Sequence, residues 1–147
     1  MKKIKAVAAL VLIAGSMSAA WAQMSPVGTW RSMDEKENTP KAQVKITEAG
    51  GVVTGKVEAL LRKGADPNAL CTECKDELKD KPVVGMTLIS GVKKAEGKEV
   101  WEGGKILDPE SGKSYTLRLT PIEDGKKLEV RGSIGPFGRT QTWLRVQ

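Results

Sequence analysis

Short strand-like runs recur along most of this chain, and this repeat limits the possible fold more than any other feature. From residue 27 onward they follow one another at intervals of about 10 to 18 residues, without a sustained helical period. In one of them, apolar Val44 and Ile46 alternate with polar neighbours, the pattern of a half-buried strand. The predicted strands are Val27–Arg31, Ala42–Glu48, Val52–Leu60, Val83–Ser90, Glu99–Asp108, Lys113–Thr120, Lys127–Ile134 and Arg139–Val146.

Most links between these runs are short and rich in turn residues, for example Asp108–Gly112 and Gly135–Gly138. Strands joined by tight hairpins form an up-and-down antiparallel meander, and closing a meander into a barrel removes its exposed edges. The sequence therefore predicts an all-β fold, an eight-stranded antiparallel barrel in a single domain over residues 23–147. An open or two-layer sheet is the alternative. The polar interval at 62–82 is predicted to be a long loop that carries both cysteines.

The first residues have the pattern of a secretory signal peptide. Lys2, Lys3 and Lys5 precede a short apolar run, and small residues at Ala20 and Ala22 suit a cleavage site after residue 22. No later segment approaches the roughly 20 apolar residues that a membrane helix needs. We therefore expect residues 1–22 to be removed and the rest to act in the periplasm or outside the cell.

The two ends of the predicted meander carry a recognisable pair of motifs. Gly28-Thr29-Trp30 opens the first strand, and Arg145 lies in the last strand, its neighbour in a closed barrel. This pairing resembles the lipocalin and wider calycin signature, in which the tryptophan plugs one barrel end and the arginine lies across its ring. The resemblance implies a cation–π contact. It makes Gly28, Trp30 and Arg145 structural residues that close the barrel.

A second resemblance covers nearly all of the chain after residue 22. The residues that carry it are Trp101–Pro109, Gly112–Tyr115, Val130–Gly132, Ile134–Gly135 and Thr142–Arg145. Together they resemble a bacterial family of exported proteins known as domain of unknown function 2147. This likeness implies an exported single domain and carries no activity with it.

The cysteines, Cys71 and Cys74, have a spacing shared by disulfide clips, redox enzymes, metal sites and haem attachment sites. In an exported protein a local disulfide is expected. Acidic neighbours such as Glu73 and Asp76 disfavour the thiolate that redox chemistry needs. Two thiolates fall short of a four-ligand zinc site, although two can hold copper(I). Lys75 stands where a haem attachment motif requires histidine.

The sequence contains no histidine, which excludes triad chemistry and histidine-based zinc hydrolysis. After residue 22 the chain has 21 basic and 18 acidic residues in a mixed pattern, which argues against nucleic-acid binding. Glu110–Ser114 echoes a phosphate-binding loop, and Ser90–Lys93 a β-lactamase motif, but each lacks its structural context. We therefore expect no enzyme activity, no cofactor and no metal.

These observations favour a non-enzymatic binding module whose barrel carries a small apolar or amphipathic ligand. The candidate lining residues are Val44, Ile46, Val57, Leu117, Leu119, Leu128 and Val130. Phe137, in a predicted turn at the barrel rim, is a candidate contact for a membrane or a partner protein. Two alternatives remain: a thiol-redox or metal-handling role for the cysteine loop, and a protein–protein interaction module of the cell envelope.

Overall fold

The computed structural model describes residues 24–147, so the predicted signal peptide lies outside the described residues. The strands are β1 (Gly28–Met33), β2 (Pro40–Ala49), β3 (Val52–Leu60), β4 (Thr87–Lys94), β5 (Trp101–Asp108), β6 (Lys113–Ile122), β7 (Lys127–Ile134) and β8 (Phe137–Arg145). Two short 3-10 turns, η1 (Asp76–Leu78) and η2 (Glu123–Gly125), complete the elements. Within this part of the chain no helix is long and apolar enough to cross a membrane.

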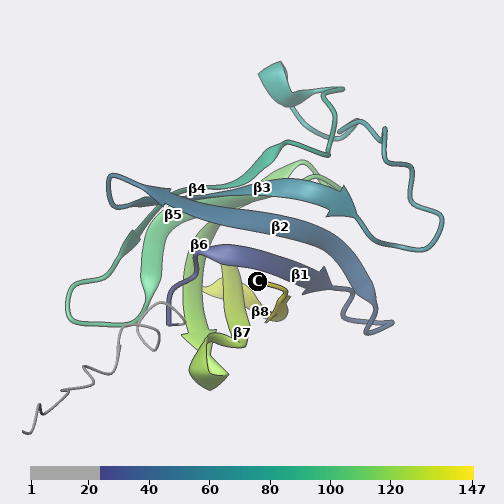
Figure 1. Cartoon of the computed structure of the whole chain (residues 1–147). Helices are drawn as coiled ribbons and strands as arrows, with labels where there is room; N and C mark the ends of the chain where they lie inside the picture. Colours follow the sequence, from purple (N-terminus) through teal and green to yellow (C-terminus); the bar gives the residue numbers. More distant parts are fainter. Residues whose placement is uncertain (1–23) are drawn as a thin grey trace, which may run out of the picture.

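All eight strands pair antiparallel in sequence order and form a closed barrel (Figure 1). The predicted eight-stranded up-and-down barrel is therefore confirmed, and the open-sheet alternative is wrong. The number of paired residues differs between neighbouring strands. β7 and β8 pair at eight positions, from Lys127↔Leu144 to Ile134↔Phe137. By contrast, β8 meets β1 at two positions, Trp30↔Arg145 and Arg31↔Leu144.

One strand begins later than the sequence pattern predicts. The run Val83–Ser90 was expected to be a strand, whereas β4 spans Thr87–Lys94. Val83 and Met86 are buried as an apolar strand residue would be, but they lie in the segment between β3 and β4 that folds back toward the barrel. Apolar residues that anchor a covering loop therefore gave the same signal as a strand.

The core fills the barrel with one contiguous cluster of apolar side chains. It includes Trp30, Trp101 and Trp143, together with the inward-facing aliphatic residues of several strands. Strand alternation explains this arrangement: in β2, Val44 and Ile46 are buried and the residue between them is exposed. Burial of these inward-facing apolar side chains is the main favourable contribution to folding.

Candidate functional site

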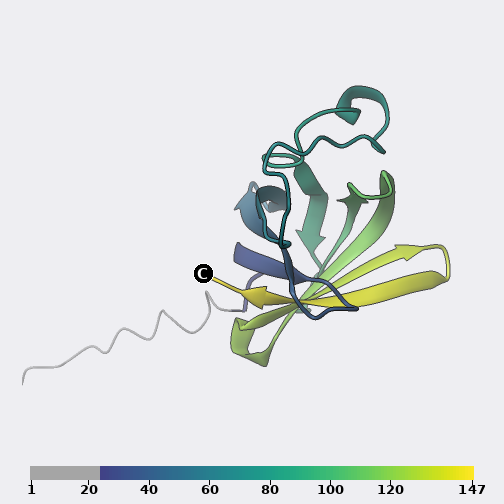
Figure 2. The same cartoon turned by 90° about the vertical axis from the view of Figure 1, so that its right-hand side faces the viewer.

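The four odd-numbered connections of the barrel meet at one end, which we call the mouth. Successive strands of an up-and-down barrel run in opposite directions, so alternate connections lie at the same end. The mouth is formed by residues 34–39, 61–86, 109–112 and 135–136, which join β1 to β2, β3 to β4, β5 to β6 and β7 to β8. The opposite, closed end holds the remaining connections, the start of β1 and the end of β8 (Figure 2).

The closed end is shut by Trp30 and Arg145. The Trp30 side chain is fully buried, and its Nε1 donates a 2.7 Å hydrogen bond to the Pro26 carbonyl. The Arg145 guanidinium carbon lies 4.2 Å from the centre of the Trp30 ring, a cation–π distance. Gly28 makes this possible, because a Cβ there would lie 2.4 Å from Arg145 Nη1. The structure thus brings together the three residues of the lipocalin-like motif.

Arg145 also ties the end of the chain to the segments around it. Its guanidinium donates to the carbonyl oxygens of Ser25 at 2.7 Å and Val27 at 2.9 Å, and its Nε donates to Gly125. Burial lowers the pKa of Arg145 below its ordinary value. An arginine remains charged at neutral pH in such surroundings, so both the cation–π contact and the hydrogen bonds persist.

The seven candidate lining residues all lie in the closed core rather than on an open surface. Each is at most 3% exposed, and they pack in one cluster with Trp30, Trp101 and Trp143. The residues concerned are Val44, Ile46, Val57, Leu117, Leu119, Leu128 and Val130. Their contact with a ligand stays a prediction, and in this structure they form the apolar floor beneath the mouth.

An apolar surface does face solvent at the mouth, on the inner side of the β7–β8 hairpin. Leu128, Val130 and Trp143 are buried, and by alternation Ile134 and Phe137 share this inner face. They are 56% and 79% exposed because β8 has parted from β1 before this point. Figure 2 shows the hairpin projecting from the barrel. Half-buried Ile106 and Tyr115, which pair in register, line the neighbouring strands.

Phe137 therefore lies at the rim, as the sequence suggested, but in a strand rather than in a turn. The turn contains two residues, Gly135 and Pro136, and β8 begins at Phe137. Ile134 was not singled out from the sequence. The alternation of Lys127–Ile134 placed it on the inner face, but its exposure depends on where β1 leaves β8, which no local pattern reveals.

Ion pairs connect the other three segments of the mouth. Arg62 reaches both Asp34, at 2.8 Å, and Glu110, and Lys41 lies 3.1 Å from the same Glu110. These pairs join the β1–β2, β3–β4 and β5–β6 connections. The β7–β8 hairpin is linked to this group through an exposed pair between Arg139 and Glu35 at 3.2 Å. Arg62, at the start of the predicted long loop at 62–82, thus takes part in a network of ion pairs that joins the segments of the mouth.

The Asp34 carboxylate of this network is held by the turn that follows it. Its Oδ1 accepts hydrogen bonds from the backbone N–H groups of Glu37 at 3.1 Å and Lys36 at 2.9 Å. These two bonds, first that of Glu37 and then that of Lys36, lower the pKa of Asp34 below its ordinary value of 3.8, and Arg62 adds to the effect. The Asp34 carboxylate therefore keeps its charge to lower pH than an ordinary aspartate does.

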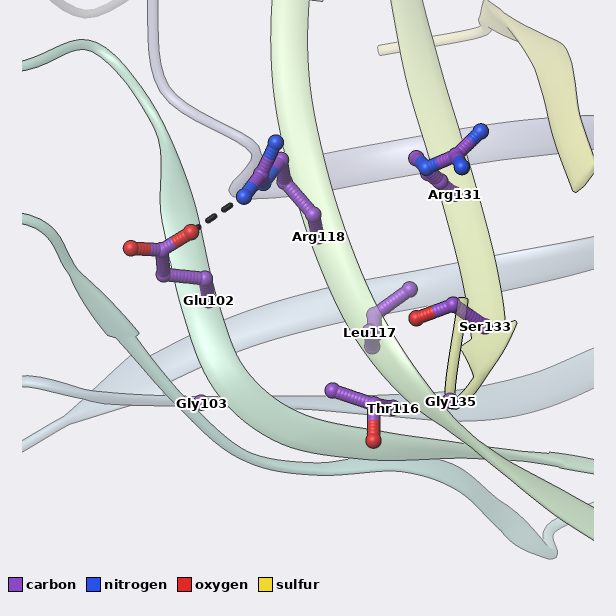
Figure 3. A pocket seen from close by; sticks show the side chains of 8 residues that line it. All are labelled: Glu102, Gly103, Thr116, Leu117, Arg118, Arg131, Ser133 and Gly135. Atoms are coloured by element: carbon purple, nitrogen blue, oxygen red, sulfur yellow. Dashed lines mark hydrogen bonds and ion pairs between the residues drawn. The ribbon is translucent and has the colours of Figure 1, made fainter. Parts of the chain in front are cut away.

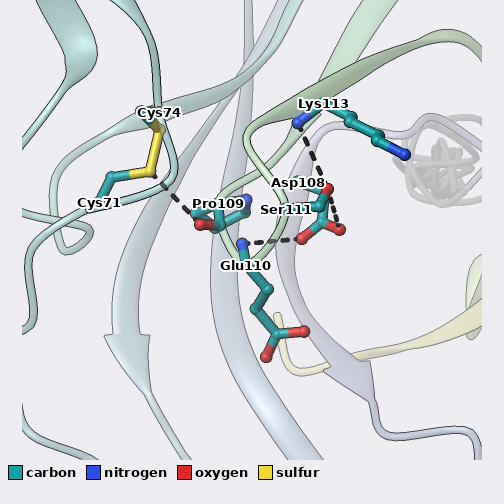
Figure 4. The surroundings of a disulfide bond; sticks show 7 residues. All are labelled: Cys71, Cys74, Asp108, Pro109, Glu110, Ser111 and Lys113. Carbon is teal, nitrogen blue, oxygen red and sulfur yellow. Dashed lines mark hydrogen bonds between the residues drawn. A yellow bond between two sulfur atoms is a disulfide. The ribbon is translucent and has the colours of Figure 1, made fainter.

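The cysteine loop is closed by a disulfide between Cys71 and Cys74 (Figure 4). Both cysteines are buried, at 1% and 4% exposure. The Cys71 backbone N–H donates to Lys81 at 2.8 Å, and the Asp80 N–H donates to Cys71 at 2.9 Å. The Cys71 sulfur lies 3.4 Å from the Pro109 carbonyl oxygen, a contact that seats the loop on the β5–β6 turn. The disulfide pairing expected from the sequence is thus present in the structure.

The thiol-redox and metal-handling alternatives stay predictions, and the structure holds the two cysteines as a buried disulfide. The sulfurs bind each other and face the protein interior, so neither presents a thiolate to solvent. Over residues 24–147 no group of three or more acidic, cysteine or histidine side chains is arranged to hold a metal ion.

Comparisons with known proteins agree with this architecture. The family model described as an uncharacterized protein conserved in bacteria (DUF2147) matches residues 28–145. A solved structure, protein HP1028 from the human pathogen Helicobacter pylori, described as belonging to the lipocalin family, is similar with a TM-score of 0.70. The two sequences are 21% identical, and the match covers 82% of each chain, so this likeness shows the fold alone. No curated protein sequence matches the chain.

Proposed function

The chain belongs to the DUF2147 family of bacterial proteins, and we propose that it is a non-enzymatic binding protein that takes a small apolar or amphipathic ligand at the mouth of its barrel. One observation carries the proposal: Ile134 and Phe137 lie on the inner face of the barrel wall and are 56% and 79% exposed. An inner wall that stays apolar where it opens to solvent is suited to an apolar guest.

The energetics of covering this surface are favourable. Fully burying a large apolar side chain such as Phe137 contributes about 1.5–3 kcal/mol, and Ile134, which is already nearly half covered, adds less. Half-buried Tyr115 and Ile106 extend the same surface toward the core. A ligand on the hairpin would therefore gain binding energy by covering these side chains.

The polar residues nearby favour a ligand that also has a polar end. By alternation Arg139 and Gln141 follow Phe137 on the inner face of β8. Arg139 is largely exposed, and its partner Glu35 is partly exposed, so a ligand acid group can compete for the guanidinium. This combination of an apolar wall and an arginine suits an amphipathic acid better than a pure hydrocarbon.

The cellular location is part of the proposal. The N-terminal sequence has the charge, length and small residues of a secretory signal, and the Cys71–Cys74 disulfide suits an oxidising compartment. We propose that the domain acts in the periplasm or outside the cell.

A fluorescence titration with a dansyl-labelled undecanoic acid tests the binding function. We expect saturable binding, weakened about tenfold or more by Phe137→Ser, since the substitution removes most of one apolar anchor. Leu144→Ser is the matched control, because Leu144 lies on the outer face of the same strand and is 37% exposed. Absence of binding, or equal weakening by Leu144→Ser, would contradict the proposal. Native mass spectrometry of protein from the cell envelope then reports the natural ligand.

The exposure of Phe137 also suits the alternative role in contacting an envelope protein. Photo-crosslinking from position 137 in living cells separates the two roles. A discrete protein adduct, combined with no binding of the dansyl acid, favours the interaction module over the carrier.

A further inference from the structure

A second candidate site lies on the outer face of the barrel, on β5, β6 and β7. It is a cleft of about 460 Å³ (Figure 3). The residues that line it are Glu102, Gly103, Thr116, Leu117, Arg118, Arg131, Ser133 and Gly135. Alternation with inward-facing Leu117 and Val130 directs Thr116, Arg118 and Arg131 outward, away from the inner face that carries Ile134 and Phe137.

Two arginines on neighbouring strands line this cleft. Arg118 and Arg131 are direct register partners, and like charges in that position destabilise a sheet. Glu102 neutralises one of them, because Arg118 Nε donates a 3.1 Å hydrogen bond to its carboxylate. Among residues 24–147 no carboxylate lies within ion-pair distance of Arg131. Glu102, Arg118 and Arg131 together therefore carry one positive charge that the described residues do not balance.

The strand next to Arg131 holds its guanidinium in place. Arg131 Nη1 donates to Thr140 Oγ1 at 3.3 Å. Gly138 leaves the necessary room, since a Cβ at that position would lie 2.6 Å from Arg131 Nη2. In Figure 3 the Arg118 side chain extends toward Glu102 and the Arg131 side chain extends away from both, so the two guanidinium groups diverge and each lines a different part of the cleft.

Hydroxyl groups complete the lining. Thr116 and Ser133 are register partners in the cleft, close to the arginine pair on the outer face. Each hydroxyl can donate one hydrogen bond, and the arginine fork offers several parallel N–H donors. Donors of both kinds thus surround a space in which the net charge is positive.

We propose that this outer cleft binds an oxyanion of the phosphate class, carried by a soluble phosphate ester or by a phospholipid headgroup. Arg131 is the main binding residue, Arg118 is the second cation, and Ser133 and Thr116 donate to the remaining oxygens. Planar guanidinium groups match phosphate oxygens in pairs, which explains why arginine suits this position better than lysine. The site lies on the opposite face of the β7–β8 hairpin from Ile134 and Phe137, and it adds a second ligand class to the protein.

The test is a titration of the folded, ¹⁵N-labelled protein with inorganic phosphate, followed by NMR. We expect shifts concentrated at Thr116, Arg118, Arg131 and Ser133, with binding weakened roughly tenfold or more by Arg131→Gln. Glu102→Gln should instead tighten binding by roughly two- to fivefold, because it removes the carboxylate that competes for Arg118. If the two side chains had only a structural role, Arg131→Gln and Glu102→Gln would not change phosphate affinity in opposite directions.

Arg31→Gln is the matched control, since Arg31 is an exposed arginine on β1 outside the cleft. The proposal is overturned if Arg31→Gln weakens phosphate binding as much as Arg131→Gln, or if phosphate shifts are scattered over the surface. Co-sedimentation with vesicles of phosphatidylglycerol, against phosphatidylcholine alone, separates the two sources. Loss of vesicle binding in Arg131→Gln identifies a lipid headgroup, whereas phosphate binding without vesicle binding identifies a soluble ester.

Discussion

The two ends of the barrel use aromatic residues in opposite ways. At the closed end, Trp30 is fully buried, hydrogen-bonded through its ring nitrogen and covered by Arg145. At the mouth, Phe137 is 79% exposed. Both lie on the inner face of the same barrel wall, so the difference comes from closure: β1 and β8 pair at Trp30↔Arg145 and have separated before Phe137.

This contrast divides the inner wall into a stabilising part and an available part. Burying an apolar side chain during folding stabilises the fold, and a side chain that is still exposed can stabilise a complex when a ligand covers it. If this division is correct, substitutions at the closed end reduce stability, and substitutions at the mouth change binding while stability stays nearly constant.

The largest expected effect is that of Trp30→Ala. Removing a fully buried tryptophan leaves a cavity and should lower the free energy of unfolding by about 3–5 kcal/mol. Phe137→Ala, the matched change at the mouth, should stay within about 0.5 kcal/mol of wild type. Urea unfolding of the three proteins measures both values. Equal losses at the two ends would show that Phe137 is a core residue in solution.

A smaller loss is expected for Arg145→Met. This change keeps the length of the side chain but leaves the carbonyls of Ser25, Val27 and Gly125 without this donor, at a cost of about 1–3 kcal/mol. At the mouth, Arg139→Met breaks an exposed ion pair and should cost less than about 1 kcal/mol. Thermal unfolding compares the two variants. A larger loss for Arg139→Met would mean that the mouth is a stabilising region.

The next effect in size concerns the cysteine loop. Replacing both Cys71 and Cys74 by Ala opens a four-residue ring, which should cost about 1–2 kcal/mol, at the low end for disulfides because so short a ring constrains little chain. Hydrogen exchange should accelerate most at the amides of residues 71 and 80, whose hydrogen bonds lie inside the loop. If barrel amides such as that of Leu119 lose as much protection, the disulfide stabilises the whole domain instead.

The closed end could be predicted from the sequence, and most of the mouth could not. Eight strand-like runs predicted a closed meander, and the resemblance of Gly28-Thr29-Trp30 and a late arginine to the lipocalin signature implied that Gly28, Trp30 and Arg145 lie together. These features are local patterns or lie in strands that a closed meander must bring together.

The mouth depends on longer-range geometry. The separation of β8 from β1 exposes Ile134, and the reach of Arg62 to Asp34 and Glu110 crosses between connections that are distant in sequence. Alternation could give the face of each residue but not the point at which two strands part. The late start of β4 has the same origin, since Val83 is buried by tertiary packing of a loop rather than by strand formation.

The smallest effect concerns the ionisation of Asp34 at the mouth. The folded-state pKa lies below its ordinary value of 3.8, so the stabilisation from this carboxylate is present above the unfolded pKa and is lost as pH falls through the folded one. Because the backbone N–H groups of Glu37 and Lys36 are the largest causes, Arg62→Gln should raise the pKa but leave it below 3.8. A ¹³C NMR titration of the carboxyl carbon measures this. A return of the Asp34 pKa to its ordinary value in Arg62→Gln would show that the ion pair with Arg62, rather than the backbone N–H groups of the turn, is the main cause of the lowered pKa.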